Sequence, residues 1–237
     1  MILIIILCIV IISTIAISLR NRDYSPSSNS SSPADIVSES SSDQSTEKPP
    51  IVIIDAGHGG WEPGAGNGST NEKDLVLAIS LEIEKVLKEK NIDSYMIRND
   101  DTYVSLEDRV RIANEKMCSL FVSIHNNSFT DSSQGGILTT YNPYSSTGED
   151  IAKIMQSNIG DIGMRNRDIV PRPTLYVLRH TNMPSLLLEI GFISNKNDLK
   201  LITDSSFQQK CAKQIVLGIE EILRKYTTDE VKSSVGD

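Results

Sequence analysis

The sequence predicts an α/β fold, a three-layer sandwich around a mainly parallel six-stranded sheet. Short apolar runs alternate along residues 51–226 with longer stretches whose apolar residues recur at helical spacing. This alternation is typical of a sheet with helices on both faces. The run 51–54 contains only β-branched residues and lies between Pro50 and Gly57. It is therefore expected to form a strand buried on both faces, as parallel strands are.

Each later element is justified by its own pattern. An apolar stripe at helical spacing predicts a helix over 72–90, with Asn71 as its cap. Ser105 and Asp108 form a capping-box signature for a helix that ends near Met117. The same criteria predict strands at 94–98, 120–124, 136–141, 175–178 and 186–190, a polar loop at 163–173, and helices at 149–162 and 207–226.

The N-terminal part of the chain differs in composition from the rest. Met1–Leu19 is long and apolar enough for a signal peptide or a membrane anchor, which we assign to residues 1–22. Arg20 and Arg22 follow this segment, and the positive-inside rule alone would then keep the remainder of the chain in the cytoplasm. The linker 23–50 is dominated by serine and proline, is expected to be disordered, and suits the outside of a membrane. We therefore expect export.

The composition of the body limits the classes of function. Residues 51–226 are expected to form one folded domain, followed by a disordered tail at 227–237. The formal net charge of −8 does not suit a nucleic-acid-binding protein. Apart from Cys8 in the leader, the chain contains only Cys118 and Cys211, which implies neither a disulfide framework nor a cysteine-rich zinc site.

Polar side chains lie where predicted apolar strands end. His58 and His125 each follow such a strand, and Glu72 lies in the first turn of the helix after the glycine-rich loop. Two histidines and one carboxylate, with a fourth position open, are a known catalytic set of zinc ligands. A structural alternative stays open, because a histidine after a strand is often simply hydrogen-bonded and Glu72 can favour its helix N-terminus electrostatically.

Glu189 is a carboxylate embedded in the apolar run SLLLEIGF. Burial of an unpaired carboxylate is costly unless a cation or a hydrogen-bond donor meets it. A zinc-activated water is one such partner, and Glu189 would then act as its general base. The alternative is a buried ion pair with Arg109 or Arg179. His180 also follows a predicted strand and is a candidate third ligand or substrate contact.

Three motifs in the chain resemble those of one enzyme family. DAGHGG, SLFVSIHNN and PSLLLEIGFISN, together with Glu72, are similar to the zinc-dependent N-acetylmuramoyl-L-alanine amidases of the Amidase_3 family, and the resemblance covers residues 51–226. It implies that one zinc ion is held by His58, Glu72 and His125 and that Glu189 is the catalytic acid/base. It further implies that an arginine of SLEDRVRIAN is structural. The implied reaction cleaves the amide between the lactyl group of N-acetylmuramic acid and the L-alanine of the stem peptide.

Four further residues are candidates for substrate contacts in such an enzyme. Arg165, Arg167 and Arg172 are expected to meet carboxylates of the stem peptide, although a solvated loop would carry the same charges. Trp61 follows the glycine loop where smaller or polar residues are common in the family. It is expected to stack on a sugar ring or to cover the metal.

Within the family, the chain resembles the spore-germination amidases. It has one catalytic domain, an apolar N-terminus and no wall-binding repeats. The resemblance implies removal of stem peptides from cortex muramic acid so that muramic-δ-lactam can form. The enzyme is then expected outside the membrane, on the forespore or mother-cell side of the cortex, either secreted or held by its N-terminal segment.

The means by which such an enzyme is restrained is a separate question. The short stretch 128–134 between SIHNN and the next glycine pair leaves no room for an inhibitory plug helix. We therefore expect a protein partner that completes or stabilises the metal site. Two other functions stay open, a wall-binding module without turnover and a zinc peptidase that cuts within the stem peptide. Glu189 argues against the first, because binding alone needs no buried base.

Overall fold

The computed structural model describes residues 52–234. The expected leader at 1–22 and the expected linker at 23–50 lie outside this range. The described residues all belong to a single compact unit. Among these described residues, no helix combines the length and the apolar character needed to cross a bilayer.

A six-stranded sheet forms the centre of the unit, as the sequence predicts. Four strands run parallel to one another; β6 is antiparallel to β8, and the edge strand β7 is parallel to β6. The strand order is β4-β1-β5-β8-β6-β7, with β1 at Val52–Ala56, β4 at Ser94–Met96, β5 at Leu120–Asn127, β6 at Ile137–Tyr141, β7 at Asn166–Pro171 and β8 at Ser185–Phe192.

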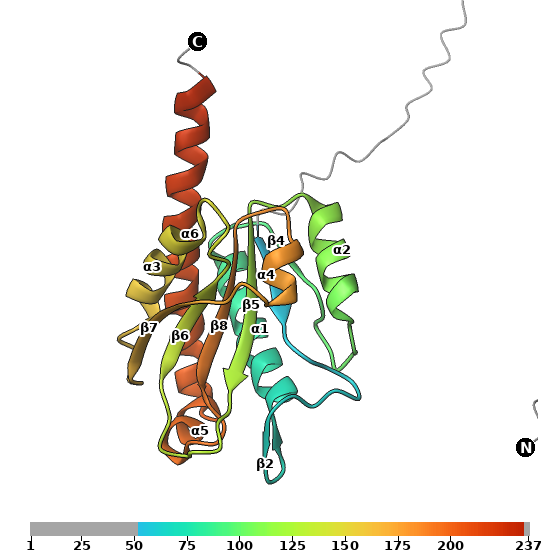
Figure 1. Cartoon of the computed structure of the whole chain (residues 1–237), viewed down its shortest axis with the longest axis vertical. Helices are drawn as coiled ribbons and strands as arrows, with labels where there is room; N and C mark the ends of the chain where they lie inside the picture. Colours follow the sequence, from blue (N-terminus) through green and yellow to red (C-terminus); the bar gives the residue numbers. More distant parts are fainter. Residues whose placement is uncertain (1–51, 235–237) are drawn as a thin grey trace, which may run out of the picture. The chain divides into compact units, whose positions relative to one another are not determined.

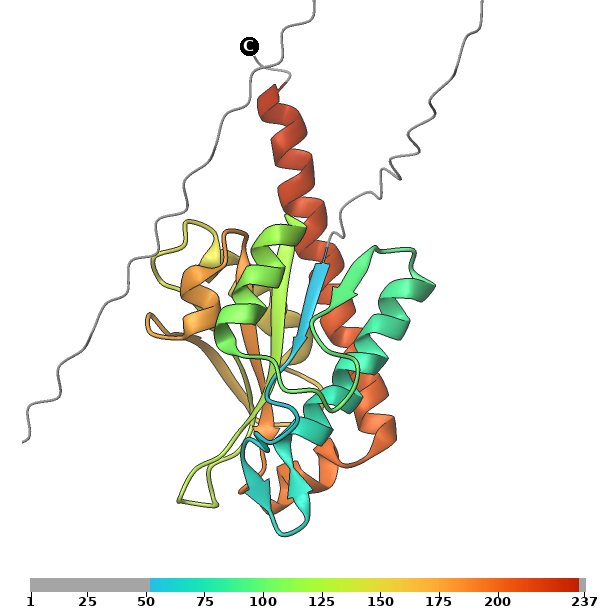
Figure 2. The same cartoon turned by 90° about the vertical axis from the view of Figure 1, so that its right-hand side faces the viewer.

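Helices cover both faces of this sheet and complete the predicted three layers (Figures 1 and 2). The helices α1 (Glu72–Glu89), α3 (Gly148–Ile159) and α6 (Ser205–Ser234) pack on one face, and α2 (Leu106–Lys116) and α4 (Tyr176–His180) pack on the other. Alternate residues of β1 point into the two cores: Val52 and Ile54 meet the first group of helices, and Ile53 meets the second.

The end of the sheet toward which β1, β5 and β8 run carries additional small elements. A hairpin of β2 (Gly66–Asn67) and β3 (Thr70–Asn71) and the short helix α5 (Lys196–Ile202) both lie there (Figure 1). Neither the two strands of the hairpin nor α5 was expected from the sequence. Because chemistry in α/β folds collects at the carboxyl ends of parallel strands, this end is where the functional side chains are sought.

Two expected elements are wrong. Residues 175–178 were expected to be a strand, but they belong largely to helix α4, which buries Val177 and Leu178 in the second core. A four-residue apolar run cannot be assigned to strand or helix by periodicity. The sixth strand is instead β7, inside the stretch expected to be a polar loop. An edge strand pairs on one side only and needs no apolar run, so its sequence gave no signal.

Helix ends follow the expected signals only in part. Ser105 accepts a hydrogen bond from the backbone N–H of Asp108 at 3.1 Å and caps α2 as predicted. Asn71 occupies the N-cap position of α1 without a side-chain capping bond. Helix α6 continues to Ser234, past the expected end at Tyr226, because the polar residues that follow include no glycine or proline to stop it before that point.

Candidate metal centre and active site

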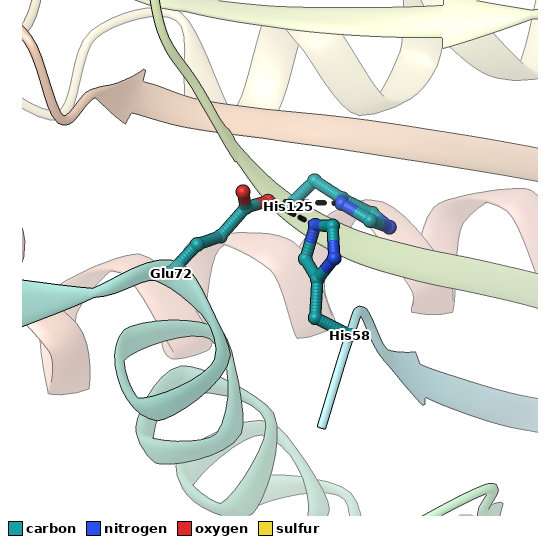
Figure 3. A group of neighbouring side chains, drawn as sticks. All are labelled: His58, Glu72 and His125. Carbon is teal, nitrogen blue, oxygen red and sulfur yellow. Dashed lines mark hydrogen bonds and ion pairs between the residues drawn. The ribbon is translucent and has the colours of Figure 1, made fainter. Parts of the chain in front are cut away.

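Three side chains from separate elements meet at the carboxyl end of the sheet. His58 follows β1, Glu72 begins α1, and His125 lies near the end of β5. The Glu72 Oε1 atom is 3.1 Å from His58 Nε2 and 2.9 Å from His125 Nδ1 (Figure 3). One ligand atom from each residue lies within 4.8 Å of the other two, so the group could hold a metal ion.

Glycines leave the space that this arrangement needs. A Cβ atom on Gly57 would lie 2.3 Å from Cε1 of the His125 ring, and one on Gly64 would lie 2.6 Å from Glu72 Oε2. The backbone of His58 itself adopts a φ of 58°, in the left-handed region that non-glycine residues rarely occupy. Such a conformation persists only where the surroundings enforce it, and it is commonly associated with functional sites.

Two buried arginines fix the loop that carries His58. Arg98 donates to the carbonyl oxygens of Ala56 at 2.9 Å and Gly57 at 2.7 Å, and Arg109 donates to the carbonyl oxygen of His58 at 2.6 Å. Arg109 also forms a buried ion pair with Asp55. Arg109 is therefore structural, and the alternative in which it neutralises Glu189 is wrong. These arginines hold the backbone on which one metal-ligand candidate is mounted.

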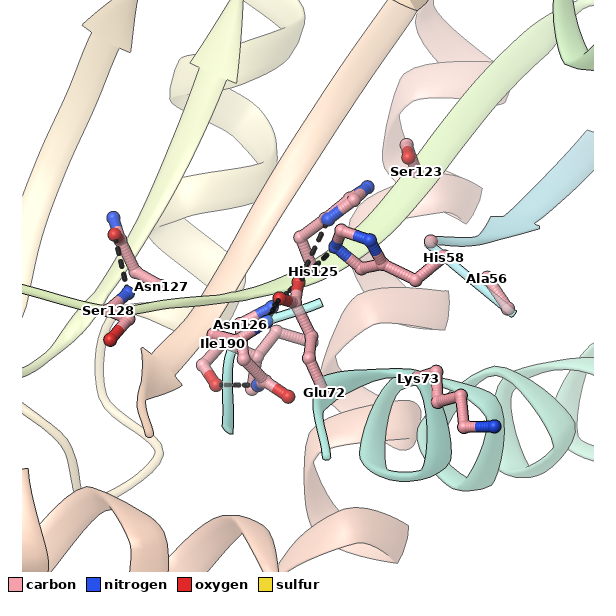
Figure 4. Close-up of polar contacts among 12 residues, drawn as sticks. Ala56, His58, Glu72, Lys73, Ser123, His125, Asn126, Asn127, Ser128 and Ile190 are labelled. Carbon is pink, nitrogen blue, oxygen red and sulfur yellow. Dashed lines mark hydrogen bonds and ion pairs between the residues drawn. The ribbon is translucent and has the colours of Figure 1, made fainter. Parts of the chain in front are cut away.

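Glu72 is held as an anion at the centre of the group. Burial opposes its charge, but the hydrogen bonds with His125 and His58 and the charges of these two rings together outweigh burial and keep the pKa of Glu72 far below its ordinary value. The backbone N–H of Asn126 donates to the same Oε1 atom at 2.9 Å (Figure 4). For His125, burial lowers the pKa, but the hydrogen bond with Glu72 and the nearby negative charges of Glu72, Glu189 and Asp55 together raise it by more, so the net shift is upward.

Glu189 lies directly beside this group. It is the register partner of His125 on the neighbouring parallel strand, so the two side chains project from the same face of the sheet. Burial raises the pKa of Glu189, and the charges of His125 and Arg172 act in the opposite direction. Among the described residues its Oε2 atom is buried and has no hydrogen-bond partner. An unpaired oxygen of this kind is available for a proton transfer.

The residues that support His58, Glu72, His125 and Glu189 were not predicted from the sequence. Asn126 supports Glu72 through its N–H and donates its side-chain amide to the carbonyl oxygen of Ile190 on β8 (Figure 4). Arg98 was also not singled out. Asn126 lies inside the SIHNN motif, which is the one signal that was available; Arg98 offered none, because its partners in the loop of His58 are backbone atoms distant in sequence.

His180 does not join the metal group. It ends α4 with an exposed side chain whose ring packs against Tyr176, at 4.4 Å between ring centroids. Within residues 52–234 the grouped metal-ligating side chains are those of His58, Glu72 and His125. The alternative of His180 as a third ligand is therefore wrong.

The four candidate substrate contacts lie in different places. Trp61 is 74% exposed and its ring packs against that of Tyr103, at 4.4 Å between centroids. Arg167, which is partly buried, and Arg172, which is exposed, line a cavity of about 270 Å³; Arg165 is also exposed and does not line it. The structure thus separates the expected arginine cluster into a pair and a single residue.

If the group holds a metal ion, replacing Gly57 with alanine is expected to lower metal affinity by about 10- to 100-fold, the range found when a ligand loses its support. The added methyl group would occupy the position of the His125 ring and force that ring to move. Competition with a chromophoric chelator measures the affinity. Gly66→Ala is the matched control, because a Cβ atom there meets nothing closer than 3.5 Å. Equal affinity in both variants would contradict the proposed packing.

Comparison with known proteins identifies relatives across the described domain. Residues 52–221 match the family model of the N-acetylmuramoyl-L-alanine amidases, Amidase_3. The uncharacterised protein YqiI of Bacillus subtilis is 39% identical over 71% of this chain and 82% of its own length.

Solved structures agree with this family. An N-acetylmuramoyl-L-alanine amidase from Clostridium difficile 630 is 35% identical with a TM-score of 0.71, over 74% of this chain and 97% of that one. The CwlD amidase of Clostridioides difficile, solved in complex with the GerS lipoprotein, is 34% identical with a TM-score of 0.70, over 73% of this chain and 98% of that one. Because the family model spans most of the sequence and its motif residues converge at one end of the sheet, the chain belongs to the Amidase_3 family of N-acetylmuramoyl-L-alanine amidases, which act on peptidoglycan.

Proposed function

We propose that the protein is a zinc enzyme that hydrolyses the amide between the lactyl group of N-acetylmuramic acid and the L-alanine of the stem peptide. One observation carries the proposal: Glu189, with an unpaired buried oxygen, is the strand partner of His125 in the group that could hold a metal. A base next to a metal-ligand set is the arrangement that activates water for attack on an amide.

The donor set fits zinc. Two imidazole nitrogens and one carboxylate oxygen, with one position left for water or substrate, are typical of catalytic zinc sites. The hydrogen bonds of Glu72 to both rings show that these ligand atoms already face a common point. Zinc would take the place of the shared protons, so its binding releases protons. We assign one ion to His58, Glu72 and His125.

The chain's own residues divide the work of the reaction. When bound, zinc polarises the amide carbonyl and lowers the pKa of a water molecule to about 7. Glu189 removes the proton of the attacking water and delivers a proton to the alanine nitrogen as the amide bond breaks. Burial suits Glu189 to both steps, because its raised pKa brings the protonated and ionised forms closer in energy near neutral pH.

Mass spectrometry of digested sacculi tests this function. Release of intact stem peptides that begin with L-alanine is the expected result. Shortened stems would identify a zinc peptidase instead, and no release would identify a wall-binding module without turnover. The unpaired oxygen of Glu189 argues against the last of these outcomes, since a binding module gains nothing from it.

Trp61 is proposed to contact the glycan part of the substrate. Its exposed ring follows the loop of His58 and is supported by Tyr103, so a flat apolar surface lies close to one metal ligand. Sugar rings stack on such surfaces. Trp61→Ala is expected to raise KM about 2- to 10-fold with little change in kcat, the size of one aromatic stacking contact. Tyr144→Ala, at the opposite end of the sheet, is the control; an equal effect there would contradict the assignment.

We further propose a role in the spore cortex, with the enzyme exported to the forespore or mother-cell side. The likeness to the CwlD amidase supports this, and the substrate lies outside the membrane. That relative's complex with a lipoprotein, together with the absence of a helix in 128–134, supports a protein partner that stabilises the metal site. Stoichiometric zinc and full cortex hydrolysis by the purified protein alone would remove the need for a partner.

A further inference from the structure

The cavity lined by Arg167 and Arg172, called the groove from here on, lies beside Glu189 and has no role in the mechanism above. It has a volume of about 270 Å³ and lies toward β6 and β7. Leu138, one of its lining residues, is the strand partner of Glu189, and Asn127, another, lies two residues beyond His125 on β5. The groove is therefore continuous with the catalytic end of the sheet and opens on the same face as Glu189.

The charge of the groove is positive. Arg167 and Arg172 line it, and its other lining residues include no acid: Asn127, Phe129, Gln134, Leu138, Val170 and Phe192. A guanidinium presents several N–H donors in a plane and matches a carboxylate in two-point contact. The groove is thus suited to a small planar anion.

The two arginines are held differently. Arg167 donates to Gln134 Oε1 at 3.1 Å and to the carbonyl oxygen of Gly135 at 3.2 Å, and its guanidinium lies 5.2 Å from the centre of the Phe192 ring. These contacts fix its direction. The guanidinium of Arg172 makes no hydrogen bond or ion pair to any described residue, and its charge reaches Glu189. The guanidinium of Arg167 is therefore held in place, and the guanidinium of Arg172 is available to a ligand.

The spacing between the strands suits a substrate that extends from Glu189 toward β7. Neighbouring strands are about 4.8 Å apart, so β7 lies roughly 10 Å from β8 before the arginine side chains shorten the gap. In an extended peptide, two residues span about 7 Å. A carboxylate on the residue after the stem alanine would therefore reach the groove while the alanine amide lies at Glu189.

We propose that Arg167 and Arg172 form a carboxylate receptor that selects stem peptides whose second residue carries a free α-carboxylate over those in which it is a carboxamide. This inference rests on the proposed amidase function. It assigns the substrate a direction across the sheet, with the peptide toward β7 and the glycan toward Trp61. Arg165, which lies in the same stretch of chain, has no part in the receptor.

Two synthetic substrates test the receptor directly. One is an N-acetylmuramoyl dipeptide with a free α-carboxylate on its second residue, and the other is the identical α-carboxamide. The wild-type enzyme is expected to prefer the acid in kcat/KM by about 10- to 100-fold, the value of a charge-assisted contact. Arg172→Gln is expected to bring this ratio close to one by raising KM for the acid only. Arg172→Lys retains part of the preference, and the control Arg165→Gln retains all of it.

Other results would overturn the receptor. Cleavage of both substrates at equal rates by the wild-type enzyme excludes it while leaving the amidase function intact. An equal loss on both substrates in Arg172→Gln would mean that Arg172 acts through Glu189 and not on the peptide. If neither substrate is cleaved, the proposed function fails, and calorimetry with the same pair then decides: tighter binding of the acid, lost in Arg172→Gln, supports the receptor, and equal binding excludes it.

Discussion

Replacing Glu189 with glutamine is expected to lower kcat by about 10³- to 10⁴-fold, the upper part of the range for one general acid–base group. Glutamine keeps the shape of the side chain but neither accepts the water proton nor returns one to the leaving amine. Zinc content is expected to stay unchanged, because Glu189 is not among the proposed ligands. Release of stem peptides from sacculi measures the first effect, and elemental analysis of the purified variant measures the second.

The pH dependence of the activity distinguishes a catalytic role of Glu189 from a merely structural one. Glu189 acts as a base only when ionised, and burial raises its pKa. Activity is therefore expected to fall, as the pH is lowered, at a higher pH than for an ordinary glutamate, and Glu189→Gln should lack this acid limb. Glu115→Gln on α2 removes an exposed carboxylate far from the site and is expected to change neither the activity nor its pH dependence. More than a tenth of wild-type activity in Glu189→Gln would remove this residue from the mechanism.

The sequence carried enough information for the four central side chains. Three of them stand out from their surroundings, as a histidine after a buried strand or a carboxylate between leucine and isoleucine, whereas Glu72 was found by its place in the first turn of the helix after the glycine-rich loop. Such residues are visible because burying them is costly. Their meeting at one end of the sheet follows from parallel strands ending together, so placement of the strands was sufficient to predict His58 and His125 as neighbours.

The supporting residues could not be predicted in this way. Arg98 acts on the backbone carbonyl oxygens of Ala56 and Gly57, and nothing in the local sequence distinguishes it from a surface arginine. Arg109, which acts on the carbonyl oxygen of His58, lies in SLEDRVRIAN, where only the family resemblance implied a structural arginine. The same limit applies to β7, whose pairing with β6 is made by main-chain atoms. Because 163–173 was expected to be a loop and no strand was expected at 166–171, its arginines were treated as one group, and the division into a lining pair and an outlying Arg165 was not visible.

Loss of a proposed metal ligand is the second change with a large expected effect. His125→Ala is expected to weaken zinc binding by more than about 100-fold, beyond the range for groups that only support ligands, and to abolish measurable amide hydrolysis. The reason is geometric as well as chemical. The ring of His125 fills the space above Gly57 and is paired with Glu72, so its removal takes away a ligand and leaves Glu72 with one imidazole neighbour.

Zinc affinity is also expected to depend on pH in a defined direction. Zinc needs the neutral imidazole of His125, and the hydrogen bond with Glu72 raises the pKa of that ring despite its burial. As the pH falls through this raised pKa, protons compete with the ion more strongly and affinity decreases. Chelator titrations at several pH values measure this slope for the wild type and for His180→Ala, the control that removes an exposed histidine outside the group. A loss of zinc in His180→Ala equal to that in His125→Ala would contradict the ligand set, because the two rings belong to different parts of the fold.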